Sequence, residues 1–357
     1  MKITHIVEAS ATGTLSMLAL LANAQAEQKN IVEVIYSIRP ETPKNITSFF
    51  SSEITLTNIQ MCSGKEKASS ILKIRSRLKK TAPDNIILHS SFAGFLGRIA
   101  SLGTLHKSHL YYIPHCISFM RKDISQLKKL TFILFEWFAA LKKSAYVACS
   151  ESEQREISAY IPFRKCHLVE NAVNINVSKA KPKASTSTTK TIITVGQIRP
   201  QKGPKEFAKI AKHALSMDPN LRFIWVGDGD ADSRAELQSS GVTVLGWIPK
   251  DEVITLLNTA DIYLSTAKWE GMPVSLIEAI YSGLPLVASG CAGNVDIIEH
   301  GLTGWIFGDN ETAANKIIEI VNNPHTAETV AKRALEVAKT RFTPQRYIND
   351  MSKLMSI

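Results

Sequence analysis

The chain has 357 residues, of which 45% are hydrophobic and 21% are charged. This composition is typical of a soluble globular protein and excludes an intrinsically disordered one, and the length favours two domains over one. Lys and Arg outnumber Asp and Glu by 42 to 32, so the formal net charge is +10. That excess suits an anionic partner, namely a phosphorylated substrate, a nucleic acid or an acidic membrane surface. It is equally compatible with the mildly basic character of many intracellular proteins.

Cysteine usage argues against a disulfide framework and against a structural zinc site. The cysteines are odd in number, scattered and free of any C-x-x-C pair. They are Cys62, Cys116, Cys149, Cys166 and Cys291. A reducing compartment fits this pattern best.

Two apolar segments bear on location. Leu15–Ala26 has the apolar run and A-x-A ending of a signal peptide, but Glu8 and a small polar stretch precede it. This favours a strand, a loop and an amphipathic helix. Leu130–Leu141 contains Glu136 and is too short to cross a bilayer, which takes about 20 apolar residues. We expect a cytoplasmic protein without a transmembrane span.

Strand-like and helix-like segments alternate along the first half of the chain. Strands are expected at Lys2–Glu8, Ile31–Tyr36, Ile54–Thr57, Ile86–His89, Tyr111–Ile113 and Tyr146–Ala148. Helices are expected between Thr14 and about Glu27, and at Ser91–Leu102, Ile124–Lys143 and Glu151–Tyr160. Strands joined by helices of this length predict a parallel sheet covered on both faces.

The alternation restarts after Ser178–Lys190, a Ser-, Thr-, Lys- and Pro-rich segment typical of a linker. Strands are expected at Thr191–Val195, Leu221–Val226, Val242–Leu245, Ile262–Leu264, Pro285–Ala288 and Trp305–Phe307. Helices are expected at Lys205–Ser216 and Ala231–Ser239, and in a C-terminal tail that breaks near Pro324 and restarts near Pro344. Two α/β units of similar length are therefore predicted, and a cleft between such units is a natural ligand site.

The most informative stretch is Trp269–Gly304, in which two short loops each follow a strand. Gly271, Met272 and Pro273 make the first turn, and Pro273 starts a helix that Gly283 closes.

The second loop of this stretch follows the strand at Pro285–Ala288. Gly290, Gly293 and Asn294 form it, ahead of a second expected helix start. Free backbone N–H groups at helix N-termini bind anions, so both loops suit phosphates and sugars.

Two glutamates, Glu270 and Glu278, flank the first turn. Glu270 is placed to accept hydrogen bonds from sugar hydroxyls, and Glu278, about one turn into the helix, from a ribose diol. The amides of Met272, Val274 and Ser275 would face a bound anion. A pair of unrelated surface carboxylates is the alternative, and the turn and helix start between them favour the site.

Two Gly-containing loops follow earlier strands of the same half. Val195–Gly203 (VGQIRPQKG) places Arg199 and Lys202 between a strand and a helix, which suits a diphosphate. A tight turn with solvated cations is the alternative, and the G-K-[ST] ending of a Walker A loop is missing. Val226–Asp230 (VGDGD) offers further turn glycines and two possible hydroxyl acceptors, Asp228 and Asp230.

Taken together and in order, these motifs resemble the retaining glycosyltransferases of family 4. They are VGQIRPQKG, VGDGD, the Ala260–Asp261 pair in ADIYLS, and EGMPVSLIEAIYSGLPLVASGCAGNVDIIEHGLTGWIF. Weaker similarity extends over HIVEASATGT, HSSFAGFLGRIA, YYIPHC, VACSESEQ and LVENAVN in the first half. The resemblance implies an α/β protein of the GT-B fold, in which two Rossmann-like domains face each other across a cleft.

The expected domain limits follow from this likeness. Residues 1–177 form the acceptor domain, 178–190 a linker, and 191–342 the nucleotide-sugar-binding domain. The C-terminal helix at 343–357 is expected to pack back on the first domain.

The resemblance also implies roles for individual residues. Glu270 would contact the donor sugar near the reacting centre, and Glu278 would hold the ribose. Lys202 would neutralise the leaving diphosphate, and His115 would lie in the cleft against the donor sugar, with a core-packing histidine as the alternative. Gly13 would let the loop after the first strand approach the diphosphate or the acceptor.

The remaining substrate-binding residues implied by the resemblance belong to the Gly-rich loops and the first helix start. They are Gly196, Gln197, Arg199, Gly227, Gly271, Met272, Pro273, Val274 and Ser275. The family usually has Arg where this chain has Gln197. Arg199, two positions on, is the candidate replacement, since it can also reach a phosphate bidentately; if it points away, diphosphate binding rests on Lys202 and backbone amides.

No metal and no cofactor beyond the nucleotide-diphosphate sugar is expected. Asp228 and Asp230 spell D-x-D, but VGDGD matches a turn of the family that is not a metal site. For retention of configuration, the resemblance implies a front-face route in which the leaving phosphate deprotonates the acceptor. His5 and His89, both on expected strands, are interpreted as structural.

Basic and apolar side chains are interleaved in the first half. The basic residues of one segment are Lys65, Lys67, Lys73, Arg75, Arg77, Lys79 and Lys80. Further cations flank the apolar segment Leu130–Leu141. This pattern suits an anionic membrane surface that carries a lipid-linked acceptor, with a solvated helix face as the alternative. Nucleic-acid binding is disfavoured because no recognition motif accompanies the charge.

The resemblance and the basic first half together imply a cytoplasmic glycosyltransferase, peripheral on the inner face of the cytoplasmic membrane. It would move a sugar from a nucleotide-diphosphate sugar to a lipid-linked or oligosaccharide acceptor in surface polysaccharide assembly (O-antigen, capsule or exopolysaccharide). A sugar-nucleotide epimerase on the same fold and a non-catalytic nucleotide-sugar-binding protein are the alternatives.

Overall fold

The computed structural model describes residues 1–174 and 189–355, and the chain forms two compact units. Unit 1 consists of Met1–Asn171 and Pro344–Ile357, and unit 2 of Ala172–Thr343. Most of the expected linker Ser178–Lys190 lies outside the described residues, and its last residue, Lys190, begins a strand.

Unit 1 contains a parallel sheet with the strand order β3-β2-β1-β4-β5-β6-β7 in its described part. The strands are β1 (Lys2–Val7), β2 (Ile31–Tyr36), β3 (Thr55–Asn58), β4 (Asn85–His89), β5 (His109–Ile113), β6 (Ala145–Ala148) and β7 (Cys166–Leu168). The direction in which the chain crosses the sheet reverses between β1 and β4. In open α/β sheets, ligands bind outside the carboxyl ends of the strands at such a reversal.

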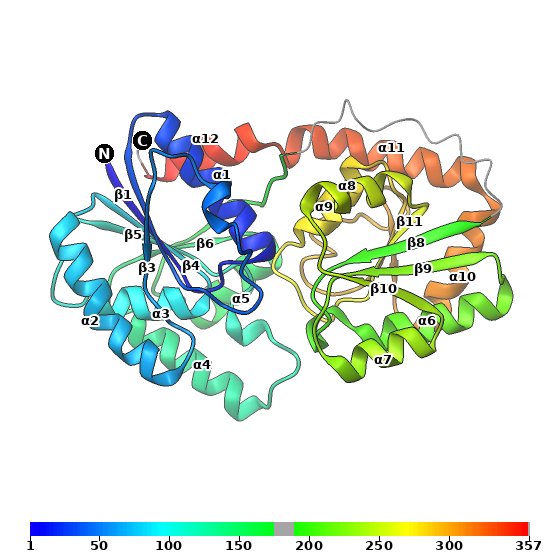
Figure 1. Cartoon of the computed structure of the whole chain (residues 1–357), viewed down its shortest axis with the longest axis horizontal. Coiled ribbons are helices and arrows are strands. Elements are labelled where there is room, and N and C mark those ends of the chain that lie inside the picture. Colours follow the sequence, from blue (N-terminus) through cyan, green and yellow to red (C-terminus); the bar gives the residue numbers. More distant parts are fainter. Residues whose placement is uncertain (175–188, 356–357) are drawn as a thin grey trace. The chain divides into compact units, whose positions relative to one another are not determined.

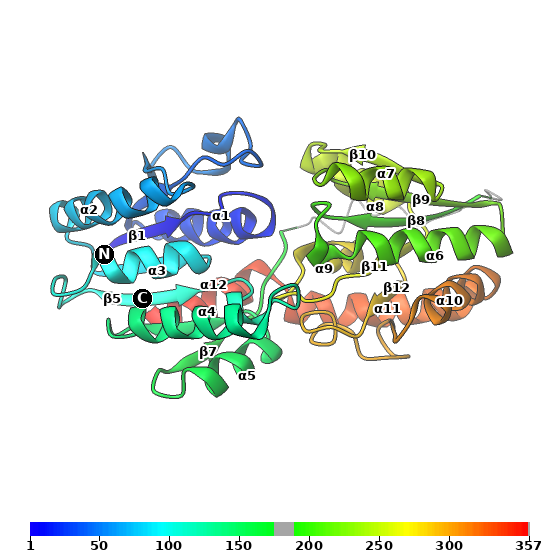
Figure 2. The same cartoon turned by 90° about the horizontal axis from the view of Figure 1, so that it is seen from below.

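Helices cover both faces of this sheet (Figures 1 and 2). One face carries α1 (Thr12–Glu27) and α12 (Pro344–Met355), and the other carries α2 (Gly64–Thr81), α3 (Ser91–Ala100) and α4 (Gln126–Ala139). Helix α5 (Glu151–Tyr160) packs against β6 and β7. Helix α12 contacts α1, and Tyr111 donates a hydrogen bond to the Leu354 carbonyl at 3.2 Å.

Helix α2 is absent from the predicted elements, because the basic residues along it obscure its apolar period. It is nonetheless strongly capped at its N-terminus. Ser63 accepts a hydrogen bond from the Glu66 N–H at 3.2 Å, and the Glu66 carboxylate accepts one from the Ser63 N–H at 2.8 Å. This reciprocal pair satisfies two backbone donors at the helix start. Helix α4 is shorter at both ends than the predicted Ile124–Lys143.

Unit 2 contains a second parallel sheet, of order β10-β9-β8-β11-β12-β13 in its described part. The strands are β8 (Lys190–Val195), β9 (Leu221–Val226), β10 (Val242–Gly246), β11 (Ile262–Ser265), β12 (Leu286–Ser289) and β13 (Trp305–Phe307). One face carries α6 (Pro204–Met217), α7 (Ala231–Ser239) and α10 (Asn310–Asn322), and the other α8 (Lys250–Thr259), α9 (Val274–Tyr281) and α11 (Pro324–Arg341) (Figure 1). One large apolar cluster of this unit includes buried residues of the sheet, α6 and α10.

The predicted break and restart of the C-terminal helical segment are confirmed, since α11 begins at Pro324 and α12 at Pro344. The prediction of a helix after Asn294 is wrong. That segment forms turns, with the Ile298 N–H bonded to the Asn294 carbonyl at 2.9 Å, and no regular helix follows among the described residues up to β13. Across the described ranges 1–174 and 189–355, no helix has the combination of length and apolarity needed to traverse a bilayer.

Candidate functional site

The reversal point of unit 2 lies between β8 and β11, which are neighbours in the sheet. The chain leaves β8 through α6 toward β9, and leaves β11 through α9 toward β12, on the opposite side. The two loops at the carboxyl ends of these strands therefore diverge over the sheet. This is the position at which doubly wound sheets bind their ligands.

Hydrogen bonds tie the two loops together. The Thr266 hydroxyl lies 2.9 Å from the carbonyl oxygens of both Lys202 and Gly203, and the Lys268 N–H donates to the Gln201 carbonyl at 2.8 Å. Gly203 has a left-handed φ of +66°, and a Cβ on it would lie 2.0 Å from the Thr266 carbonyl oxygen. Only glycine permits this approach, so the loop after β8 is held directly over the loop after β11.

Lys202 and Glu270 meet where these loops join. Lys202 Nζ lies 2.7 Å from Glu270 Oε1, and the two side chains are 19% and 9% exposed. Gln201 Nε2 donates to Glu270 Oε2 at 3.2 Å. Burial acts to lower the pKa of Lys202, but the Glu270 carboxylate outweighs it and the pKa is raised. Lys202 is therefore a firmly protonated cation at this edge of the sheet.

The loop after β12, which contains Gly290, Gly293 and Asn294, packs against the backbone of Glu270. The Glu270 N–H donates to the Ala292 carbonyl at 3.1 Å. Gly293 has a φ of +85°, and a Cβ on it would lie 2.6 Å from the Cβ of Glu270. This loop was expected to start a helix, whereas its small residues instead let it pack against the Glu270 backbone.

The N-terminus of α9 provides hydrogen-bond donors beside this pair. Pro273 is the N-cap, and the N–H groups of Val274 and Ser275 bond to no other described residue. Tyr263 on β11 donates to the Ser275 hydroxyl at 2.9 Å, which fixes the helix start over the strand end. Free N–H groups at a helix N-terminus, with the positive end of the helix dipole, bind phosphate oxygens.

Glu278 lies one turn further along α9. It is 3% exposed, and its carboxylate pairs with the Nζ of Lys250, the first residue of α8. The side chain of Lys250 is 51% exposed, so it can move into solvent when a ligand takes its place. Lys250 was not predicted as a site residue, because nothing in its sequence surroundings marks it.

The remaining predicted residues of unit 2 border this site. The Gly196 carbonyl accepts a hydrogen bond from Trp225 Nε1 at 2.8 Å, and the Gly227 N–H donates to the Gly246 carbonyl at 2.9 Å. Gln197 is half-buried, whereas Arg199 is exposed and its guanidinium contacts no described acceptor. Arg199 is thus available to a phosphate.

The two aspartates of the D-x-D sequence, Asp228 and Asp230, each bond to a nearby residue of α7. Asp228 pairs with Arg234 at 2.8 Å, and Asp230 accepts a hydrogen bond from the Ser233 N–H at 2.9 Å as the N-cap of α7. Within the described ranges there is no group of three or more His, Cys, Asp or Glu side chains that would hold a metal ion.

Gly13 and His115 belong to unit 1. Gly13 lies in the first turn of α1 and not in the loop before it, which corrects the expected placement. His115 follows β5 with a φ of +55°, and its Nε2 lies 3.1 Å from His89 Nδ1. His89 and His5, interpreted from the sequence as structural, are therefore connected to His115.

Comparisons with known proteins match the chain to two family models. The model for glycosyl transferases group 1 covers residues 177–337, and the model for Glycosyltransferase Family 4 covers residues 12–177.

Individual relatives agree with these models. A UDP-Gal:alpha-D-GlcNAc-diphosphoundecaprenol alpha-1,3-galactosyltransferase of Escherichia coli is 26% identical over 87% of this chain and 84% of its own length. An uncharacterized 41.2 kDa protein in the cps region of Klebsiella pneumoniae is 28% identical over 79% of this chain and 81% of its own. The crystal structure of Anabaena HepE in complex with UDP-glucose superimposes with a TM-score of 0.82, at 20% identity, over 100% of this chain and 99% of that one.

The two family models follow one another along the chain, and the two parallel sheets have the architecture of the solved relative. The chain belongs to the group 1, family 4 type of glycosyltransferases and has the GT-B fold of two Rossmann-like domains.

Proposed function

We propose that this glycosyltransferase moves a sugar, with retention of configuration, from a uridine-diphosphate sugar to a saccharide on a polyprenyl diphosphate carrier, in the assembly of a surface polysaccharide. The main observation that supports a nucleotide-sugar donor is the Lys202–Glu270 pair beside the free N–H groups of α9. The acceptor class is supported by the relatives, one named for a diphosphoundecaprenol-linked acceptor and one for its place in a cps region. Neither the family models nor the relatives support the epimerase alternative.

The chemistry follows from where charge develops. The bond between the anomeric carbon and the diphosphate oxygen breaks, so negative charge grows on that oxygen in the transition state. Lys202 and the N–H groups of Val274 and Ser275 are preorganised cationic and dipolar donors for it. Such groups are worth most in a site shielded from water, because they need no rearrangement during the reaction.

Glu270 and Glu278 are assigned to hydroxyl groups of the donor. In the free protein each carboxylate is neutralised by a lysine, Lys202 and Lys250 respectively. A bound diphosphate supplies a competing anion for Lys202, which releases Glu270 to accept hydrogen bonds from the sugar. Glu278 exchanges the exposed ammonium of Lys250 for a ribose diol. The leaving phosphate then takes the proton of the acceptor hydroxyl on the same face of the sugar.

Donor binding is tested by thermal unfolding of the full chain with a panel of nucleotide sugars. A uridine-diphosphate sugar is expected to raise the melting temperature, because a ligand at 100 times its Kd stabilises the native state by about 2.7 kcal/mol. The shift should shrink in Glu278→Gln and persist in Glu236→Gln, an α7 glutamate away from the site. Equal shifts in both variants, or no shift with any nucleotide sugar, would contradict the donor assignment.

The outward face of α4 supports membrane docking. Its exposed large apolar residues recur at helical spacing. They are Leu127, Leu130, Leu134, Phe135, Trp137 and Phe138, and Leu141 just after the helix is exposed as well. Lys128 on the same helix and Lys122 and Lys143 beside it are exposed, and none of them pairs with a described carboxylate.

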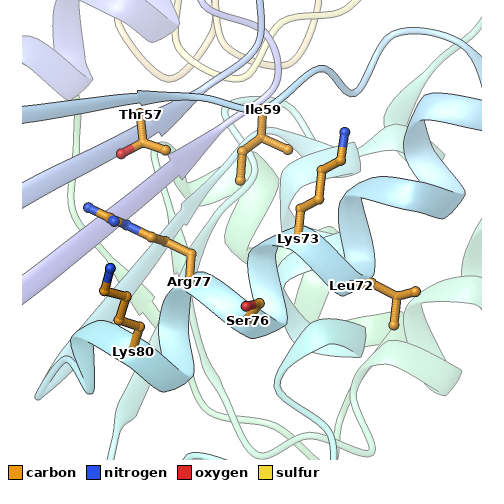
Figure 3. A pocket seen from close by; sticks show the side chains of 7 residues that line it. All are labelled: Thr57, Ile59, Leu72, Lys73, Ser76, Arg77 and Lys80. Atoms are coloured by element: carbon orange, nitrogen blue, oxygen red, sulfur yellow. The ribbon is translucent and has the colours of Figure 1, made fainter.

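The surface of α2 adds further positive charge. A groove between β3 and α2 is lined by Thr57, Ile59, Leu72, Lys73, Ser76, Arg77 and Lys80 (Figure 3). Arg77 turns toward the strands and pairs with Glu33 at 2.6 Å, whereas Lys73 and Lys80 form no ion pair within the described part of the chain. An apolar stripe flanked by free cations is suited to the interface of an anionic bilayer, where each lysine near the surface contributes about 1 kcal/mol.

Vesicle sedimentation tests this placement. The chain should bind vesicles containing phosphatidylglycerol and not vesicles of phosphatidylcholine alone, and binding should weaken as salt rises. Replacing Leu134 and Phe138 by Ser should lower the bound fraction at least about tenfold, since each buried apolar side chain contributes about 1.5–3 kcal/mol. The matched control replaces two exposed apolar residues of unit 2, Met217 and Leu245. Equal losses in both double variants would exclude α4 as the docking face.

A further inference from the structure

A row of three histidines and one glutamine crosses the sheet of unit 1. Gln25 Oε1 on α1 lies 2.7 Å from His5 Nε2, and His5 Nδ1 lies 3.0 Å from His89 Nε2. His89 Nδ1 then lies 3.1 Å from His115 Nε2. Gln25, His5 and His89 are all 1% exposed or less, and only His115 is partly exposed. We call this row the histidine row.

Strand register explains how the row forms. His5 is on β1 and His89 is the last residue of β4, with Val7 opposite His89 in the parallel pairing. His5 and Val7 are two residues apart on one strand, so His5 and His89 lie on the same face of the sheet. Ile113 at the end of β5 is opposite His89, and His115 follows two residues later. The row therefore runs from the middle of β1 to the carboxyl edge of β5.

The backbone at the outer end of the row is held in an unusual conformation. His115 and Cys116 have φ values of +55° and +105°, a region that non-glycine residues rarely adopt. The buried carboxylate of Glu153 accepts hydrogen bonds from the N–H groups of Cys116 and Ile117, both at 2.8 Å. Strain of this kind persists where the surroundings impose it and is concentrated at functional sites. Here it aims the imidazole of His115 at His89.

The side-chain amide of Gln25 determines which ring nitrogens of the row donate hydrogen bonds and which accept them. Its Nε2 lies 3.8 Å from the sulfur of Met355 on α12, and a thioether sulfur accepts hydrogen bonds but cannot donate them. The amide nitrogen therefore belongs on that side, and Oε1 faces His5 as an acceptor. His5 must then carry its proton on Nε2 and accept on Nδ1, and the same assignment passes to His89 and to His115.

The three rings are neutral, as this assignment requires. Burial lowers the pKa of His5 to about 4 and that of His115 to about 4. Burial and the neighbouring histidines place the pKa of His89 well below its ordinary value. At neutral pH the row therefore contains one proton for each ring.

We infer that Gln25, His5 and His89 are positioning residues that hold His115 in the Nε2–H tautomer, so that its bare Nδ1 accepts a hydrogen bond from a substrate hydroxyl. This inference rests on the proposed function, whose substrates carry sugar hydroxyls. Nδ1 of His115 bonds to no described residue, so it is the one ring nitrogen of the described row left for a ligand. A hydroxyl fits this nitrogen because it can donate, whereas an ionised phosphate only accepts.

The first measurement is the ring ¹⁵N spectrum of the histidines in the unchanged full chain, assigned by the loss of one signal set in His115→Gln. The expected result is a protonated Nε2 and a bare Nδ1 for His115 near neutral pH. A protonated Nδ1 would overturn the inference. This readout needs no activity, so it separates failure of the inference from failure of the proposed function.

The second measurement compares Gln25→Met with Gln154→Met. Gln154 on α5 donates to the Cys166 carbonyl at 3.1 Å and is not a member of the histidine row. Gln25→Met removes the terminal acceptor, so His115 should shift to a mixture of tautomers and kcat/KM should fall at least about tenfold, as a wrong histidine tautomer is costly. Gln154→Met should change neither. The positioning role would be wrong if Gln25→Met lowered kcat/KM without changing the tautomer of His115. It would also be wrong if Gln25→Met changed neither quantity.

Discussion

Lys202→Met is expected to lower kcat by about 10²–10³-fold, the usual cost of removing one preorganised donor from a developing oxyanion. Lys202 is paired with Glu270 at 2.7 Å, and its pKa is raised despite burial because of that carboxylate. Lys202 is therefore charged at neutral pH. The variant loses the only side-chain cation that the described loops after β8 and β11 bury beside the N-terminus of α9.

The matched control for this prediction is Lys268→Met. Lys268 lies in the loop after β11, pairs with Glu206 at 3.1 Å and is 43% exposed, so its loss should change kcat less than about threefold. The melting temperature of the double variant Lys202→Met with Glu270→Gln shows how much any loss of stability in Lys202→Met comes from an unpaired buried carboxylate. Steady-state kinetics of the two single variants then compares their kcat values. If Lys202→Met retains the kcat of Lys268→Met, the electrostatic role of Lys202 is wrong.

The second large effect concerns stability and arises from a buried charge cluster in unit 1. Arg98 on α3 is fully buried, and its Nη2 lies 2.7 Å from Glu136 Oε2 on α4. Tyr146 donates to the same oxygen at 2.9 Å, and Tyr112 to Glu136 Oε1 at 3.3 Å. Burial opposes the charge on Arg98, but the Glu136 carboxylate outweighs it and raises the guanidinium pKa. This cluster fastens the apolar helix α4 to the sheet.

Glu136→Ala is expected to destabilise unit 1 by about 3–5 kcal/mol, because it leaves a buried guanidinium without its carboxylate. Glu156→Ala is the control, since Glu156 pairs with Lys129 at 3.8 Å and is 40% exposed. That surface pair should contribute at most about 1 kcal/mol. Because the chain has two units, unfolding in urea should be followed by hydrogen exchange on peptides of unit 1. Equal effects of the two variants would show that the cluster does not stabilise α4.

Much of the fold was predictable because apolar strands and amphipathic helices alternate clearly. Ile31–Tyr36 and Leu221–Val226 have the bounds expected from their runs of β-branched and aromatic residues. Helices α11 and α12 begin at prolines, where the missing N–H costs nothing. Helix α2 was missed because cations interrupt its apolar face, and the helix after Asn294 was wrong because small residues there serve packing against Glu270.

The site was only partly predictable. The local sequence pattern predicted Glu270, Lys202 and the start of α9 as parts of the site, since each lies in a Gly- or Pro-containing loop after a strand. The partners of these residues come from distant segments, so no local pattern could reveal that Lys250 neutralises Glu278. The histidine row was equally hidden, because His5 and His89 are ordinary strand residues until the register of β1 and β4 places them on one face.

The proposed function is tested most directly by measuring sugar transfer. The purified chain is incubated with radiolabelled uridine-diphosphate sugars, one at a time, and a polyprenyl-diphosphate-linked N-acetylglucosamine, and label is counted in the lipid fraction. One donor is expected to label the lipid through a new α linkage, and Glu270→Gln is expected to abolish the signal. Equal label with Glu270→Gln, a β-linked product, or no lipid label from any uridine-diphosphate sugar would show that the proposed transfer reaction is wrong.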